Sequence, residues 1–291
     1  KMGMVSNEMR RALGNPWFKG SMVVLIMLAV AAALFQVNTY VGHWQQVIAE
    51  YGNESYYYHT TFSCFNNWLP LRGANPAAGF FFVVLPLLVL MGYAWSLASD
   101  VRSGYVAQVL TRSTRGEFYK ARYCAVFTSA GLLATIPLIV NLLIVACFLP
   151  AYMPRVTDAM YIDMGPTDLF ANVFFSAPLL YVLLKLVVNF VLCGLWATMV
   201  MSLATVWANR VVLICVPYIA LLLIKHVGEN LFVAMRLNGY EHFGMSITLF
   251  DQLKGSPDNF YCYWWATLAC AVLMLVVSIV VPYFRRKADV L

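Results

Sequence analysis

Side chains that could do chemistry are few in this sequence, and the clearest ones lie in apolar surroundings. Lys185 and Asn189 are four residues apart in an aliphatic run, so one helical face would carry both. A cation at that depth in a membrane is costly unless it pairs, meets water or reaches the interface. The two residues therefore predict either a position on a transport pathway or subunit interface, or a lysine that extends to the outer headgroups.

A second polar group lies in the outer half of a later apolar run. Lys225 and Glu229 have the i,i+4 spacing of a helical ion pair, and His226 and Asn230 are next to them. The group indicates either a break of the span into a re-entrant element or the exit of the helix from the bilayer. Both interpretations stay open, and Lys225 and Glu229 join Lys185 and Asn189 as candidate pathway or interface residues.

Catalytic and nucleotide-binding patterns are missing from the sequence. It contains no G-x-x-x-x-G-K-[ST], H-E-x-x-H or G-x-S-x-G motif, and its four histidines lack ligand spacing. An intramembrane enzyme would need paired acids or histidines in its spans, and an ion-driven carrier would need acidic groups near the midplane. We therefore predict no catalytic residue, metal site or cofactor in this chain.

Seven cysteines are present, mostly inside apolar runs where a free thiol behaves as a small hydrophobic side chain. Cys64 and Cys262 both fall in predicted outer segments. They could form a disulfide if the compartment is oxidising and the backbone brings them together.

The elements that must position these residues are membrane-spanning helices. The chain is 62% hydrophobic and 11% charged, whereas soluble domains carry about 25% charged residues. Apolar runs long enough to cross about 30 Å of hydrocarbon lie at 19–41, 77–98, 123–149, 177–206, 211–236 and 261–284. The sequence therefore predicts an all-α integral membrane protein, with one six-helix transmembrane domain over residues 1–291.

The basic residues give an orientation. The opening segment has four Lys or Arg residues, loop 99–122 has five, and the tail after 284 has three. Each of the other long loops has one, at 42–76, 150–176 and 237–260. Because basic residues concentrate on the cytoplasmic side, we expect a multi-pass cell-membrane protein with both termini in the cytoplasm. The net charge of +6 reflects this topology and does not indicate nucleic-acid binding.

The opening segment predicts an amphipathic helix over 4–14 that lies in the inner headgroup layer. Its apolar face carries Val5, Met9, Ala12 and Leu13, and Asn7, Glu8, Arg10 and Arg11 lie toward the other face. The sequence Gly14-Asn15-Pro16 follows, with residue types typical of a helix end, an N-cap and a first helical position. We expect a sharp elbow before the first span.

Loop 99–122 predicts a helix, a break and a second helix. Val101, Tyr105, Val109 and Leu110 are apolar at near-helical spacing, which indicates a short helix along the inner membrane face. Thr114 and Glu117 then form a capping box that begins the helix leading into the third span. The alternative is an ordinary positive-inside loop.

Two segments resemble bacterial ABC transporter permeases of the type-two exporter family. The first is Glu8-Met9-Arg10-Arg11-Ala12-Leu13-Gly14-Asn15-Pro16-Trp17-Phe18. The second comprises Asp100-x-x-Ser103-Gly104-Tyr105, Leu110-Thr111-Arg112-x-x-Arg115 and Tyr119-Lys120-Ala121-Arg122-Tyr123. The predicted six-span layout is similar to that family along the whole chain.

The resemblance implies a permease subunit that exports an amphipathic, peptide, lipid-like or drug-like substrate. Its partners would be a second permease subunit, identical or related, and an ABC ATPase that holds ATP and magnesium. The implied coupling element is 100–115, and its expected ATPase contacts are Asp100, Arg102, Tyr105, Arg112 and Arg115. Segment 237–260 would be an outer, re-entrant element. The alternatives are an ion-driven carrier, an intramembrane enzyme or a scaffold that works without an ATPase.

Overall fold

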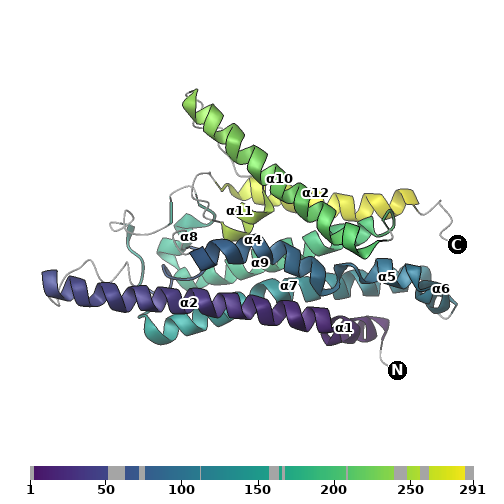
Figure 1. Cartoon of the computed structure of the whole chain (residues 1–291), viewed down its shortest axis with the longest axis horizontal. Coiled ribbons are helices and arrows are strands. Elements are labelled where there is room, and N and C mark those ends of the chain that lie inside the picture. The colour runs from purple at the N-terminus through teal and green to yellow at the C-terminus, as the bar shows by residue number, and fades with distance from the viewer. Residues whose placement is uncertain are drawn as a thin grey trace.

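The computed structural model describes residues 3–51, 63–71, 76–111, 113–156, 164–165, 168–207, 209–238, 248–255 and 262–285. Over these ranges the regular structure is helical and contains no strand (Figure 1). Six helical stretches are long and apolar enough to cross a membrane: Pro16–His43, Pro76–Arg102, Arg115–Phe148, Pro178–Leu203, Arg210–Met235 and Trp264–Phe284. The predicted all-α bundle of six spans is confirmed.

Three long helices form the centre of the bundle: α2 (Pro16–Tyr51), α7 (Arg115–Phe148) and α9 (Pro178–Leu203). α7 packs against both α2 and α9, and α4 (Pro76–Val89) lies beside α2. α10 (Arg210–Leu237) and α12 (Trp264–Arg285) lie at one side, and α10 slants away from the other helices (Figure 1). Their apolar side chains are mostly exposed, as lipid-facing helices require.

Two glycines allow α7 and α9 to approach closely. A Cβ atom on Gly131 would lie 2.5 Å from the ring of Phe190, and one on Gly194 would lie 2.6 Å from the ring of Phe127. The two rings meet edge to face, with centroids 5.6 Å apart. Each helix therefore inserts a ring against a glycine of the other, which is the small-residue packing that membrane helices use in place of hydrophobic burial.

The predicted elbow is confirmed. α1 (Met4–Gly14) ends at Gly14, Asn15 has an extended backbone, and α2 begins at Pro16. The Asn15 side chain accepts a hydrogen bond from the Trp17 amide at 3.0 Å, which caps the start of α2. The predicted polar face of α1 is only partly correct, because Glu8 and Ala12 are buried together while Val5 is 46% exposed.

The predicted coupling loop contains two short helices. The second span ends in one wide π-helical turn, η1 (Leu90–Ala94), followed by α5 (Ser96–Arg102). Gly104 has a left-handed backbone with φ of 71°, and α6 (Tyr105–Leu110) begins after it. The single short helix predicted across 101–110 is therefore wrong, since Gly104 divides it. The predicted start of α7 is confirmed, because Thr114 is its N-cap and the Thr114 hydroxyl accepts from the Glu117 amide.

The other end of the bundle is closed by segment 63–71, by α8 (Ala171–Ser176) and by α11 (Leu249–Lys254). Trp68 is fully buried and donates its indole N–H to the Leu138 carbonyl at 3.0 Å. Asn141 accepts from the Leu69 amide and donates to the Ala29 carbonyl, so that it links segment 63–71, α7 and α2. We call this the α8 end and the opposite one the α1 end, where α5 and α6 also lie (Figure 1).

Candidate functional site

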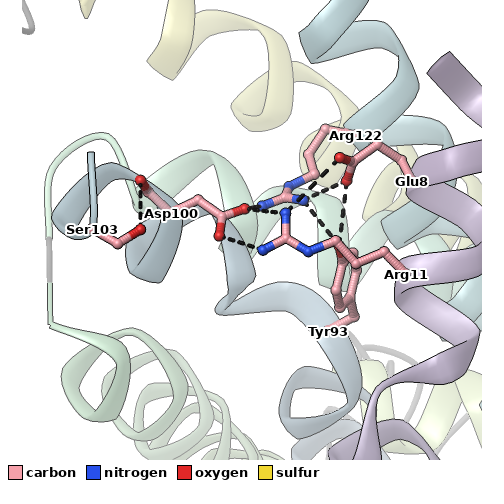
Figure 2. Close-up of polar contacts among 6 residues, drawn as sticks. All are labelled: Glu8, Arg11, Tyr93, Asp100, Ser103 and Arg122. Atoms are coloured by element: carbon pink, nitrogen blue, oxygen red, sulfur yellow. Dashed lines mark hydrogen bonds and ion pairs between the residues drawn. The ribbon is translucent and has the colours of Figure 1, made fainter. Parts of the chain in front are cut away.

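Ionised side chains from three elements meet at the α1 end of the bundle. We call this group the charge cluster, and Figure 2 shows its members around the Arg122 guanidinium. The cluster consists of Glu8 and Arg11 from α1, Tyr93 from η1, Asp100 from α5 and Arg122 from α7. Arg122 is fully buried, Asp100 is 4% exposed and Glu8 is 5% exposed.

The geometry of the charge cluster is that of linked ion pairs. Arg122 donates to a carboxylate oxygen of Glu8 and to one of Asp100, and to the Tyr93 hydroxyl at 2.9 Å. The Arg11 guanidinium donates two hydrogen bonds to the carboxylate of the same Asp100, at 2.8 Å and 2.6 Å. The Tyr93 hydroxyl donates a hydrogen bond to a carboxylate oxygen of Glu8 at 3.3 Å. The π-helical turn η1 carries Tyr93 into this network, and such turns are frequent at functional sites.

The cluster is balanced in charge, with two carboxylates against two guanidinium groups. Burial alone would lower the pKa of Arg11, but the hydrogen bonds and the negative charge of Asp100 outweigh it and raise that pKa above its ordinary value. Arg11 therefore stays charged at any physiological pH. A buried ion pair is costly to break, because removal of one partner leaves the other charge uncompensated in a medium of low dielectric.

Arg11 also extends the cluster to α6. Its guanidinium lies 4.6 Å from the centroid of the Tyr105 ring, in cation–π geometry. Through Asp100 and Tyr105 it contacts both short helices of the loop, while Asp100 reaches Arg122 at the start of α7. The arrangement therefore connects α1, the end of the second span, α6 and the third span in one network.

The residues predicted for ATPase contact fall into two groups. Arg102, Tyr105 and Arg115 are exposed at the α1 end, as a contact surface requires. Asp100 is not, because its carboxylate is buried between Arg11 and Arg122, and its predicted role as a surface contact is wrong. Arg112 lies outside the described residues.

Sequence reasoning missed the roles of Glu8 and Arg122, a buried acid and the fully buried base of the cluster. It placed Glu8 on the polar face of a surface helix, and it counted Arg122 as a topology signal and as part of the family resemblance. A signal was present, since Glu8 and Asp100 are two of the few acids predicted at that membrane end and Arg122 borders the third apolar run. Acids and bases that border different spans at the same depth are candidates for pairing.

Lys185 lies in a second buried polar site, nearer the α8 end. It is fully buried, and its ammonium donates to the backbone carbonyl of Gln252 at 3.2 Å. Gly255 closes the site, because a Cβ atom there would lie 1.9 Å from the Lys185 nitrogen. Asn189 is also fully buried and donates to the Lys185 carbonyl at 2.9 Å. Within this chain, neither predicted position for the two residues is correct: they do not line an open pathway or interface, and Lys185 does not extend to the headgroups.

The same site holds α11 against the bundle. The Gln252 side chain is fully buried, and its oxygen accepts from the hydroxyl of Thr267 on α12 and from the thiol of Cys262. Gln252 thus contacts α9 through its backbone and α12 through its side chain. α11 reaches the level of Lys185, about two turns into α9, within the part of predicted segment 237–260 that the structure describes.

The ion pair predicted from the spacing of Lys225 and Glu229 is present in α10. Lys225 and Glu229 approach to 3.8 Å, and Lys225 also lies 5.4 Å from the ring centroid of Phe250. Asn230 donates to the carbonyl of His226 at 3.0 Å. α10 continues as one helix from Arg210 to Leu237, so a break at this group, one of the two interpretations, is wrong.

Cys64 and Cys262, whose pairing the sequence left open, are not bonded to each other in this structure, and both thiols are free and buried. Burial raises the pKa of Cys262 to about 11 and raises that of Cys64 as well. Both therefore stay protonated and unreactive at neutral pH.

Among the residues that the structure describes, no three His, Cys, Asp or Glu side chains are close enough to hold a metal ion. Comparison of the chain with protein-family models, curated proteins and solved structures finds no match. The functional interpretation therefore rests on the sequence resemblance, on the fold and on these two sites.

Proposed function

We propose that this chain is the permease subunit of an ATP-driven exporter of the ABC type. It would work with a separate ATPase and a second permease subunit, and move an amphipathic, peptide, lipid-like or drug-like substrate out of the cytoplasm. The resemblance of the elbow and of loop 99–122 to that family motivates the proposal, and six spans support it. The α1 end, with its many basic residues, would face the cytoplasm.

The observation that carries the proposal is the connection between an exposed loop and the buried spans. α6 has no buried residue and lies at the surface beside Arg102 and Arg115. Arg11 and Asp100 nevertheless connect this loop to α1 and to Arg122 of α7. A push on α6 by an ATPase would therefore move α1 and the third span together, and a loop that only marks topology needs no such connection.

Charge reversal on the loop tests the proposal. Arg102→Glu with Arg115→Glu changes two exposed charges and leaves the charge cluster intact. We expect the doubly substituted protein to insert and fold normally, and to retain at least about tenfold less ATPase subunit on affinity purification from membranes, because the contact surface changes sign. Quantitative mass spectrometry of a nucleotide-hydrolysing protein that co-purifies with the chain measures this.

Arg155→Glu is the matched control, since Arg155 is an exposed arginine at the α8 end. It should leave the amount of co-purified ATPase unchanged. The proposal is wrong if the unchanged chain retains no nucleotide-hydrolysing partner, or if the double substitution retains as much as the unchanged chain does.

A further inference from the structure

A cavity of about 420 Å³ lies in the crook of the elbow, beside the charge cluster. Arg10 and Asn15 line it from α1 and the elbow, and Trp95, Ser96 and Ser99 line it from the end of the second span. Its volume lies within the range of about 300–1,000 Å³ that is typical of small-molecule sites. The charge cluster forms its inner wall through Arg11 and Asp100.

The surroundings of the cavity carry an excess of positive charge. The four ionised groups of the charge cluster cancel one another, so they leave no net charge. Arg10 is exposed and has no ion pair or hydrogen bond with any described residue. Arg210 adds a second cation, 6.0 Å from the centroid of the Trp95 ring. A ligand of this cavity is therefore expected to be an anion.

A buried hydroxyl without a hydrogen-bond partner also indicates an anionic ligand. Ser96 is 4% exposed, and in the described part of the chain its oxygen has no hydrogen-bond partner, although the residue lines the cavity. Most buried polar groups in proteins are satisfied, so an unpaired one indicates a missing partner. An oxyanion in the cavity would accept a hydrogen bond from the Ser96 hydroxyl. The N-terminus of α2, which begins at Pro16 beside Asn15, also favours negative charge in the cavity, because it is the positive end of the helix dipole.

The position of the cavity selects the kind of anion. It lies where a surface helix turns into a membrane span, and Trp17, which is 49% exposed, and Trp95 lie near it. Tryptophan is enriched at the headgroup level of membranes. The exposed apolar side chains of Val23 and Val24 continue along α2, where acyl chains would lie. We propose that this cavity binds the phosphate headgroup of an anionic phospholipid.

In this site Arg10 supplies the charge and Ser96 supplies a neutral donor. The lipid would hold the elbow at the membrane surface through its headgroup and through its chains. The inference does not depend on an ATPase partner, because it concerns the isolated chain and the bilayer around it. If the proposed export function is wrong, the lipid site can still be correct, and if the lipid site is wrong, the export function can still be correct.

Native mass spectrometry of the full chain, released from detergent with mixed lipids, tests the proposal. The probes are phosphatidylglycerol and phosphatidylcholine with identical acyl chains. We expect phosphatidylglycerol to be retained in preference to phosphatidylcholine, and Arg10→Ala to lower that preference about fivefold, which corresponds to one basic residue near an anionic membrane surface. Ser99→Phe fills the cavity without removing a charge and should abolish the preference.

Lys19→Ala is the matched control. Lys19 is an exposed cation on the first turns of α2, but it does not line the cavity. It should change the preference by less than about twofold, because its charge acts only through solvent. Equal retention of the two lipids by the unchanged chain would overturn the proposal, and so would an equal effect of Lys19→Ala and Arg10→Ala.

A second measurement separates a lipid headgroup from free phosphate. Inorganic phosphate is added to the delipidated chain, and the midpoint of thermal unfolding is recorded. We expect no stabilisation that depends on Arg10, since the bound group needs its acyl chains to stay in place. A phosphate-induced rise in the midpoint that Arg10→Ala removes would identify the ligand as a free oxyanion and overturn the lipid assignment.

Discussion

Arg122 and Lys185 are both fully buried, and both lie in helices long enough to span a membrane. Their surroundings differ. Arg122 donates to two carboxylates that come from different elements, Glu8 on α1 and Asp100 on α5. Lys185 donates to a neutral carbonyl, that of Gln252, and Asp168 acts on it only electrostatically.

The difference shows two ways to hold a buried cation. In the charge cluster, opposite charges compensate one another, so the loss of one member leaves its partner uncompensated. At Lys185 a backbone carbonyl of α11 accepts from the ammonium, and Asp168, which accepts a hydrogen bond from the Gly165 amide, acts on it only at longer range. Removal of the lysine therefore breaks no ion pair with a described residue. The first arrangement connects elements strongly, and the second holds one short helix in place. Substitutions at the two sites should therefore have very different costs.

The largest effect is expected for Arg122→Met. The substitution leaves Glu8 without its principal partner and Asp100 with Arg11 alone, inside the bundle. Removal of one member of a buried ion pair costs about 3–5 kcal/mol, and we expect a loss of this size in the free energy of unfolding. Denaturant titration of the purified chain in mixed micelles measures it.

Two further variants sharpen this result. Arg115→Met removes an exposed arginine a few residues earlier and should change the free energy of unfolding by no more than about 0.5 kcal/mol. Glu8→Leu combined with Arg122→Met should cost less than the sum of the single substitutions, because the unpaired carboxylate is gone. An additive double substitution would show that the two side chains are not coupled.

The sequence could predict those features of the fold that depend on residues close together in the chain. The spans follow from the length of apolar runs, the elbow from Gly14-Asn15-Pro16, and the start of α7 from the capping box of Thr114 and Glu117. In each case the residues that determine the feature lie within or next to it, so the local sequence is enough to predict it.

The partners in both buried sites could not be predicted in this way. Glu8 and Arg122 are 114 residues apart, and Lys185 and Gln252 are 67 apart. Helical spacing alone placed Glu8 on the outer face of α1, because a charged residue is usually exposed and only the position of Arg122 reverses that expectation. The π-helical turn that carries Tyr93 also has no sequence pattern that we can identify.

The next largest effect is expected for Gly255→Ala. Gly255 has φ of 75°, a conformation that costs an alanine energy, and the new Cβ atom would lie 1.9 Å from the Lys185 nitrogen. We expect a loss of about 1–3 kcal/mol in the free energy of unfolding. Gly228→Ala is the control: no atom lies within 4 Å of its Cβ position in α10, so it should be neutral or slightly stabilising.

Gly255→Ala combined with Lys185→Met tests whether the loss of stability arises from contact with the lysine. If it does, Gly255→Ala should cost less in a Lys185→Met background, because the methionine lacks the terminal nitrogen that the new methyl group meets. An equal cost in both backgrounds would assign the whole effect to the backbone of Gly255 and none to Lys185.

The smallest effect is expected for Lys185→Met itself, and it separates the two sites most directly. The substitution removes one hydrogen bond to Gln252, but it also removes the cost of keeping an ammonium group out of water. These contributions oppose each other, so the free energy of unfolding should change by less than about 1 kcal/mol, as when buried ionic groups are replaced by apolar ones of similar volume. Measured beside Arg122→Met, the same change of a buried cation to methionine should thus be tolerated at one site and damaging at the other. A loss at Lys185 as large as that at Arg122 would mean that the ammonium has an anionic partner, and that both sites are built from compensating charges.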